Sequence, residues 1–325
     1  MNEMKQTIPV FFTIDDGYAP WLSAALQSLI ANASQDYHYD IVILHQELQK
    51  ENRQRLASAA VGKDAFTIRF VSMQAVQERM ENITDRMENR LRCDYFTLTI
   101  YFRLFIPEMF PEYDKGIYID SDIIVPGDIS KMYNINLGDN LIGACPDHSV
   151  VDIPELAHYM EGAVGVDRYQ YINSGVLLMN LKKLREIHFS EQFLYLLNTY
   201  HFDCIAPDQD YLNAMCNGKI LYLDECWDAM PNDKKPPLKN PQLIHYNLFD
   251  KPWCYDNIQY EEYFWKYAAQ TPYYKEIVDF KNSYSQKQVQ SDRKCLSDLI
   301  QKADTMPLAD VTFRKMKAGG ERIRV

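Results

Sequence analysis

Short apolar runs alternate with helical stretches through the first hundred residues, and this alternation restricts the fold more than any other feature of the sequence. The runs are brief and rich in β-branched residues, as strands are. The strand candidates are residues 8–14 (IPVFFTI), 39–45 and 66–71. The helical stretches are residues 18–33, 48–60 and a segment that ends near 92. Strands that alternate with helices form βαβ units around a parallel sheet, so we predict an α/β fold.

The rest of the chain continues in mixed form and changes character near residue 255. Further strand candidates are residues 115–119, 141–145 and 171–181, and helices are expected over 96–110, from about 182 to 200 and from Pro207 onward. Residues 224–241 are rich in Pro, Asn, Asp and Lys and predict a long loop. Beyond Tyr255 the sequence is aromatic and helical in composition. We therefore expect a catalytic domain over residues 1–254 and a helical region over 255–325.

Charge and cysteine content limit the partners and the compartment. The formal net charge is -11, so a polyanion such as DNA would be repelled and nucleic acid is excluded as a partner. The seven cysteines are odd in number and none is spaced as a CxxC pair, which argues against a disulfide framework and a zinc ribbon. No segment is long enough to span a membrane. These features favour a cytoplasmic protein.

The C-terminal tail carries the one local excess of basic residues. Its basic residues are Lys302, Arg314, Lys315, Lys317, Arg322 and Arg324, against the acids Asp304, Asp310 and Glu321. Such a tail can lie on the anionic inner face of a membrane as a peripheral contact. The other interpretation is a solvated tail without a partner.

Two aspartates interrupt a hydrophobic run in the segment Tyr118-Ile119-Asp120-Ser121-Asp122-Ile123. Burying two carboxylates at the end of a strand is costly unless a cation neutralises them. A divalent metal does so, and Mg²⁺ and Mn²⁺ prefer such hard oxygen ligands. Such an ion can also bind a diphosphate leaving group. Taken alone, Asp-x-Asp equally describes a solvated turn.

A second polar cluster follows the apolar pair Leu243-Ile244. His245 is a candidate third ligand, and nitrogen beside two carboxylates favours Mn²⁺ over Mg²⁺. Six residues later, Lys251 supplies a positive charge for a phosphate. Trp253 is expected to pack rather than to react.

Several separate motifs, in one order, resemble family 8 glycosyltransferases, a group of retaining enzymes that includes bacterial lipopolysaccharide galactosyl- and glucosyltransferases and the glycogenins. The motifs are FFTIDDGYAPWLSAALQSL, YFRL, YIDSDIIV, GACPDH, YINSGVLLMNLKKL, DQDYLN and HYNLFDKPW. The resemblance covers residues 8 to 253. It implies a GT-A fold, a Rossmann-like nucleotide-diphospho-sugar transferase fold, and transfer of glucose or galactose from a uridine diphosphate (UDP) sugar. The acceptor would be a glycan or a lipid-linked saccharide in cell-surface glycan synthesis.

The resemblance also implies roles for individual residues. Asp120, Asp122 and His245 would bind Mn²⁺, with Mg²⁺ as the alternative ion. The residues that would bind the nucleotide and phosphates are Asp15, Tyr18, Ser121 and Lys251. Those that would hold the donor hexose are Arg103, Asp147, Asn173, Asp208 and Gln209. Gln209 would lie nearest the anomeric carbon and stabilise an oxocarbenium-like state during front-side attack.

Each of these polar residues also has an ordinary structural interpretation. Arg103 could snorkel from its helix or pair with Asp94, and Asn173 could belong to a strand bulge. Asp208 could be a first-turn acid favoured by the helix dipole, and Asp147 could simply form a turn beside Pro146.

Departures from the family pattern leave other classes open. Leu248 stands where the family usually carries Gly, Gly17 replaces a frequent Asn, and Tyr95 replaces a frequent His. A UDP-sugar-binding protein with weak turnover is therefore one alternative. A haloacid-dehalogenase-like phosphatase is another, since Asp120 and Asp122 also fit its nucleophile and general acid. No GxxxxGK[ST] or GxGxxG motif is present, which disfavours P-loop kinases and nicotinamide dehydrogenases.

Overall fold

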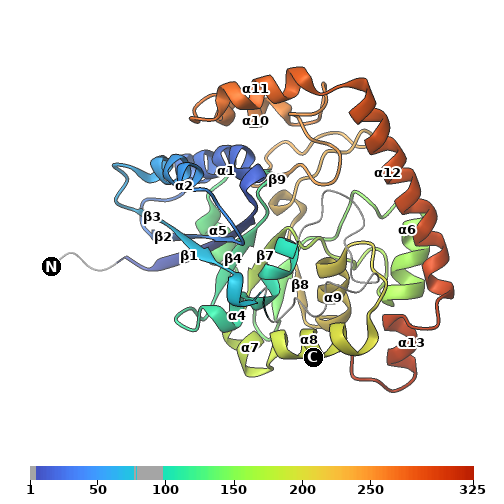
Figure 1. Cartoon of the computed structure of the whole chain (residues 1–325). Coiled ribbons are helices and arrows are strands. Elements are labelled where there is room, and N and C mark those ends of the chain that lie inside the picture. The colour runs from blue at the N-terminus through green and yellow to red at the C-terminus, as the bar shows by residue number, and fades with distance from the viewer. Residues whose placement is uncertain (1–4, 77, 79–97) are drawn as a thin grey trace.

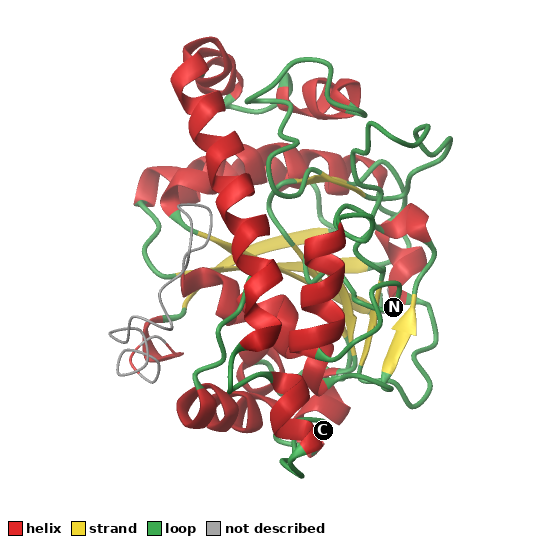
Figure 2. Ribbon diagram, turned by 90° about the vertical axis from the view of Figure 1, so that its right-hand side faces the viewer, coloured by secondary structure: helices red, strands yellow, loops and turns green. Residues whose placement is uncertain are grey.

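A seven-stranded sheet with helices packed against it forms the centre of the molecule (Figures 1 and 2). The computed structural model describes residues 5–76, 78 and 98–325. Successive side chains of a strand point to opposite faces, and the first strand follows this rule. Val10 and Phe12 join one hydrophobic core with α1 (Ala19–Asn32), while Phe11 joins the other. The sheet therefore separates two cores, as the predicted α/β fold requires.

The strands of this sheet lie in the order β3–β2–β1–β4–β7–β6–β8. Their bounds are β1 Thr7–Ile14, β2 His38–His45, β3 Phe66–Ser72, β4 Gly116–Ile119, β6 Ile142–Ala144, β7 Val176–Met179 and β8 Ile220–Tyr222. The first four of them pair in parallel, as predicted from the βαβ pattern. Strand β7 runs antiparallel to both β4 and β6, which the sequence did not indicate.

The predicted strand over residues 171–181 is wrong at its start and also at its end, where Asn180 caps helix α7. Only Val176–Met179 forms strand β7, and Ile172 makes one isolated bridge to Pro146. Asn173 has a buried side chain whose Oδ1 accepts a hydrogen bond from the Gly175 amide at 2.8 Å. Polar side-chain hydrogen bonds of this kind compete with the hydrogen bonds between strands, so residues 173–175 form a loop instead of continuing the strand.

A second, two-stranded sheet brings distant segments together. Strand β5 (Ile123–Ile124) pairs antiparallel with β9 (Ile244–His245), and Ile123 stands opposite His245. Because β5 begins one residue after Asp122, this pairing places His245 beside the Asp120-Ser121-Asp122 turn.

The N-terminal two thirds of the chain contain short helices, of which α5 and α6 were not predicted and two others differ in form from the prediction. Their bounds are α2 Lys50–Ala57, α4 Ile106–Met109, α5 Ile129–Tyr133, α6 Pro154–Tyr159, α7 Leu181–Glu186, α8 Phe189–Tyr200 and α9 Pro207–Met215. The helix expected over 96–110 is a 3₁₀ helix (Leu98–Phe105) followed by α4, because Pro107 has no N–H to donate to Arg103. The helix expected to reach residue 200 breaks at His188, whose φ is +54°. The helix expected to end near residue 92 lies largely outside the described residues.

The C-terminal region is helical, as predicted, and folds back over the rest of the chain (Figure 1). Its helices are α10 Glu261–Ala268, α11 Tyr274–Ser283, α12 Gln286–Thr305 and α13 Phe313–Ala318. Helices α10 and α11 pack on α1, and α12 packs on α6. Across the described part of the chain, we find no helix with the length and apolar character needed to cross a membrane.

The basic tail is not a free solvated segment. Phe313 is 3% exposed, and its ring lies 3.9 Å from that of Phe202. Ile323 is also buried, and the Val325 amide donates to the Met215 carbonyl at 3.1 Å. Two apolar side chains in a charged run are enough to fix the tail against the core.

Candidate active site

The polar residues singled out in the sequence meet at one edge of the sheet. Asp15, Asp120 and Asp147 each follow a strand of the same direction, namely β1, β4 and β6. Because β7 runs the other way, the loop before it, with Asn173, reaches this same edge. Ligands of α/β sheets bind at such carboxyl ends, so the topology explains why distant motifs form one site.

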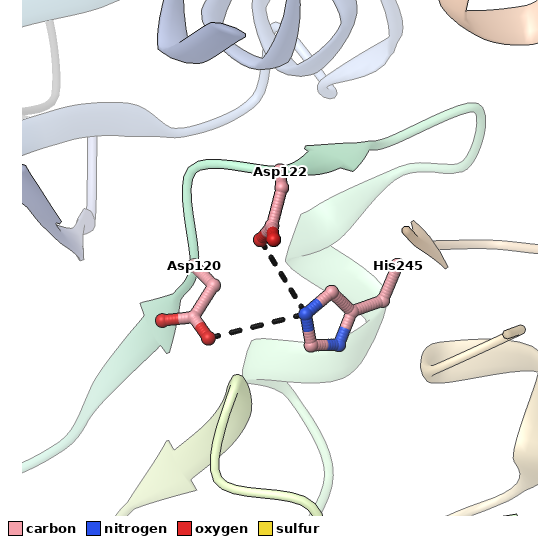
Figure 3. Close-up of side chains that lie close together, drawn as sticks. All are labelled: Asp120, Asp122 and His245. Carbon is pink, nitrogen blue, oxygen red and sulfur yellow. Dashed lines mark ion pairs between the residues drawn. The ribbon is translucent and has the colours of Figure 1, made fainter. Parts of the chain in front are cut away.

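Asp120, Asp122 and His245 form a group that could hold a metal ion (Figure 3), and we call these three residues the metal group. One ligand atom from each residue lies within 4.8 Å of the others. His245 Nε2 is 3.4 Å from an oxygen of Asp122 and 3.9 Å from an oxygen of Asp120. Two carboxylates and one imidazole are a suitable set for Mn²⁺, because they offer hard oxygens and one nitrogen.

Asp228 orients the imidazole, a role that no sequence motif indicated. Its Oδ1 lies 3.1 Å from His245 Nδ1, and its side chain is fully buried. Burial alone would lower the pKa of His245, but hydrogen bonds to Asp122 and Asp228 raise it to about 10. A carboxylate on the second nitrogen fixes which nitrogen faces a metal and increases its basicity.

Gly175 leaves the space that the three ligands occupy. A Cβ atom at this position would lie 2.3 Å from His245 Cε1 and 2.7 Å from Asp120 Oδ2. A side chain there would therefore push the imidazole away from the carboxylate, so glycine is required for the group to assemble.

Lys251 reaches this group rather than open solvent. Its Nζ forms an ion pair with Asp122 and donates to the Tyr246 carbonyl, and the residue is 4% exposed. Burial alone would raise the pKa of Asp122, but Lys251 and His245 together hold it well below its usual range. Lys251 thus places a buried positive charge directly beside Asp122.

Arg103 connects the metal group to helix α9. Its guanidinium lies 2.9 Å from an oxygen of Asp120 and 3.1 Å from an oxygen of Asp208, and it donates to the Ser174 carbonyl at 2.7 Å. The residue is 4% exposed, so it does not snorkel. Asp94, the other partner considered for it, lies outside the described residues.

Tyr118 also holds the Asp120 carboxylate in place. Its hydroxyl donates to Asp120 Oδ1 at 2.6 Å and contacts the Thr13 hydroxyl at 2.7 Å. Together with Arg103, it fixes the orientation of Asp120. Nothing in the strand pattern of Tyr118 distinguished it from an ordinary core residue.

Gln209 is held in one orientation by two unlike partners. Its Oε1 accepts from the Ser174 amide at 3.0 Å, and its Nε2 donates to Asp147 Oδ2 at 3.1 Å. A flipped amide would place donor against donor and acceptor against acceptor. Asn173 also donates to Asp147 Oδ2, at 3.0 Å. Asp147 therefore aligns both side-chain amides toward the cavity.

These residues line one cavity of about 340 Å³. Asp15, Tyr18, Ser121 and Lys251, which the resemblance assigned to the nucleotide and phosphates, also line it. Asp15 Oδ1 accepts from the Tyr18 amide at 3.1 Å and so fixes the turn after β1. Every site residue predicted from the sequence thus contacts this cavity.

Leu248 adopts the backbone conformation that explains why glycine is expected there. Its φ is +47°, in the left-handed region that glycine enters at little cost. The loop keeps this conformation with a leucine whose side chain is 38% exposed. Gly17 is exposed, and Tyr95 lies outside the described residues.

Comparison with known proteins supports the resemblance to family 8 glycosyltransferases. Residues 9–257 match the family described as Glycosyl transferase family 8. The chain is 26% identical over 230 residues to a putative glycosyltransferase of Haemophilus influenzae, covering 71% of this chain and 66% of the relative. It is 23% identical over 320 residues to the lipopolysaccharide 1,2-glucosyltransferase of Escherichia coli, covering 88% of this chain and 87% of that one.

Solved structures show the same fold. The galactosyltransferase LgtC, in complex with donor and acceptor sugar analogues, has a TM-score of 0.69 and 26% identity, covering 82% of this chain and 96% of its own. The bifunctional glycosyltransferase WbbM has a TM-score of 0.73 and 24% identity, and this chain spans 53% of it. The predicted GT-A fold is thereby confirmed. Since the family match extends over more than half of the chain, the chain belongs to glycosyl transferase family 8.

Proposed function

We propose that the protein transfers glucose or galactose from a UDP-sugar, with retention of configuration and dependence on Mn²⁺, to a glycan or lipid-linked saccharide. The observation that carries this proposal is the convergence of Asp120, Asp122 and His245 on a cavity lined by Arg103, Asp208 and Gln209. Relatives named as a lipopolysaccharide glucosyltransferase and a galactosyltransferase support the choice of hexoses.

The three metal-group residues fit a divalent ion, and Mg²⁺ is the alternative to Mn²⁺. When bound, such an ion would neutralise the negative charge of the donor diphosphate, including the charge that develops as UDP leaves. Lys251 would add a second positive charge at the phosphates. Asp15 and Tyr18 would hold the nucleoside part of the donor in the turn after β1.

The remaining residues would act on the hexose. Arg103, Asp147, Asn173 and Asp208 would orient its hydroxyls through the hydrogen-bond network that already connects them. Gln209 would face the anomeric carbon, with its Oε1 dipole stabilising positive charge there. The acceptor oxygen then bonds to the anomeric carbon while the bond to the diphosphate oxygen breaks. The electron pair goes to UDP, which also takes the acceptor proton.

One assay tests this proposal. Incubation with UDP-glucose or UDP-galactose and Mn²⁺ should release UDP, and Asp120→Ala should abolish the release. Asp139→Ala is the matched control, because the Asp139 side chain is 97% exposed and does not line the cavity. Phosphate release from a phosphomonoester would instead support the phosphatase alternative, and tight UDP binding without turnover would support the binding protein suggested by Leu248.

Gln209→Ala should lower turnover more than donor affinity, because its contact to the anomeric carbon strengthens only as charge develops. Unchanged turnover in this variant would remove Gln209 from the proposed mechanism.

We also propose peripheral contact with an anionic membrane at the cytoplasmic face through the basic tail. Deleting residues 311–325 is a poor test, because it removes the buried Phe313 and Ile323. Lys317→Glu with Arg322→Glu changes two exposed side chains instead. Weaker sedimentation with anionic vesicles would support the contact, and unchanged sedimentation would refute it.

A further inference from the structure

The cavity that contains the metal group has a second side to which the proposed mechanism gives no role. Helices α6 and α12 pack against each other there (Figure 1). Their side chains and those of two neighbouring segments form what we call the apolar wall. Its members are Ile153, Leu156, Met160, Ile205, Leu296 and Leu299.

The apolar wall cannot satisfy sugar hydroxyls. Leu156, Met160 and Ile205 are each less than a tenth exposed and offer no polar side-chain atom. Tyr159 lies among them, but its hydroxyl donates to Asp210 at 2.6 Å and is already committed. A hydroxyl buried without a partner costs free energy, whereas alkyl surface gains from burial. The wall is therefore suited to an alkyl group.

The apolar wall is continuous with the site of transfer. Ile205 and Ala206 line the cavity and lead directly into Asp208 and Gln209 at the start of α9. A molecule with a hydroxyl at Gln209 thus has the apolar wall beside it within the same cavity.

Helix α12 is fixed in this position by polar contacts at its first turns. Asp292 is 8% exposed and accepts hydrogen bonds from the hydroxyls of Tyr255 and Tyr284. Leu296 and Leu299 follow it by four and seven residues, which places all three on one face of the helix. The C-terminal region therefore supplies part of the cavity surface.

We propose that the apolar wall binds the alkyl part of an amphipathic acceptor, a hydroxyl-bearing sugar attached to a hydrocarbon chain. This inference rests on the proposed function, because it takes the metal group as the donor end of the cavity. The sugar hydroxyl attacks the anomeric carbon and yields its proton to the departing UDP, while the hydrocarbon chain lies against α6 and α12.

Binding of paired glycosides tests the inference. Octyl and methyl β-glycosides of glucose and of galactose have the same head groups and differ in chain length. Calorimetry with the whole protein in UDP and Mn²⁺, below the micellar concentration of the octyl compounds, should show at least about tenfold tighter binding of the octyl member, since burial of two methylenes accounts for that ratio. Equal binding of octyl and methyl glycosides would overturn the inference.

Variants locate the binding surface. Leu299→Asp should abolish the preference for the octyl glycoside, and Leu308→Asp should keep it, because Leu308 is 75% exposed and lies outside the cavity lining. Leu299→Ser serves if the aspartate variant does not fold. Equal effects at both positions would overturn the inference. UDP release from the UDP-sugar without acceptor is measured on the same samples. Absence of UDP release would defeat the proposed function, whereas the preference for the octyl glycoside tests the apolar wall independently.

Discussion

The two sides of the cavity are built on different physical principles. The polar side, formed by the metal group and its partners around Arg103 and Gln209, is a network in which almost every atom has an assigned hydrogen bond or ion pair. The apolar wall has no such network and depends on packing between α6 and α12. A directional network tolerates little displacement, whereas an apolar surface accepts groups of varied shape. We infer that the donor end is selective and the acceptor end more permissive.

The largest expected effect comes from the polar side. Asp122→Asn keeps a hydrogen-bond acceptor for Lys251 but removes the carboxylate charge from the metal group. We expect UDP release to fall about a thousandfold, because stabilisation of the leaving diphosphate is lost. Steady-state UDP release at saturating Mn²⁺ measures this. A loss below tenfold would show that the polar side does not depend on its metal group.

Asp210 lies where the two sides meet, since Tyr159 and Tyr171 both donate to it at 2.6 Å. Burial raises the pKa of Asp210 from 3.8 to about 6, although its hydrogen bonds lower it. Between those values the folded chain binds the extra proton, so this residue makes the free energy of unfolding fall as pH rises from 4 to 6. Asp210→Asn should remove a fall of about 2–3 kcal/mol.

Chemical denaturation of both proteins at pH 4 and pH 7 measures this contribution. The difference in stability between Asp210→Asn and the unchanged chain should shift in favour of the variant at pH 7. A difference in stability that is the same at both pH values would contradict the raised pKa of Asp210 in the folded chain.

Adding one methyl group at the polar side should affect metal binding, whereas a change at the apolar wall should not. Gly175→Ala places Cβ within 2.3 Å of His245, and we expect Mn²⁺ affinity to fall about 30-fold, within the range for disturbed metal-ligand geometry. Leu299→Ala, which alters the apolar wall, should leave Mn²⁺ affinity unchanged. Calorimetry without donor measures both. Equal affinities in the two variants would contradict the contrast between the sides.

The smallest expected effect tests how far the polar network extends. Asp228→Asn keeps a partner for His245 Nδ1 but removes its charge, and Mn²⁺ affinity should fall about tenfold. The melting temperature without metal provides the control for folding. Unchanged affinity in a folded variant would show that Asp228 has no part in orienting the imidazole.

The sequence was informative about the polar side because its residues lie in short motifs at strand ends. Asp120, Asp147 and His245 could be placed together once the strands were identified and the family resemblance was seen. Asp228 could not, because it meets His245 through the isolated bridge between Ala229 and Ile244, and a single bridge within a predicted loop leaves no pattern in the sequence. The antiparallel direction of β7 was missed for a similar reason, since strand direction leaves no mark in a four-residue run.

The apolar wall could not be foreseen for a different reason. Leu296 and Leu299 lie in a mostly polar helix where they look like ordinary core positions, and α12 lies outside the matched residues 9–257. The docking of the tail was likewise hidden, because Phe313 and Ile323 are isolated in a charged run. Long-range packing, rather than local pattern, decides both features.

The central claim is that Asp120, Asp122 and His245 seat one divalent ion beside the donor diphosphate. Anomalous diffraction at the manganese edge, from crystals grown with Mn²⁺ and UDP, tests it directly. The account predicts a single strong peak coordinated by one oxygen of each aspartate and by His245 Nε2. A peak elsewhere in the molecule, or a diphosphate held without an ion between these residues, would contradict it.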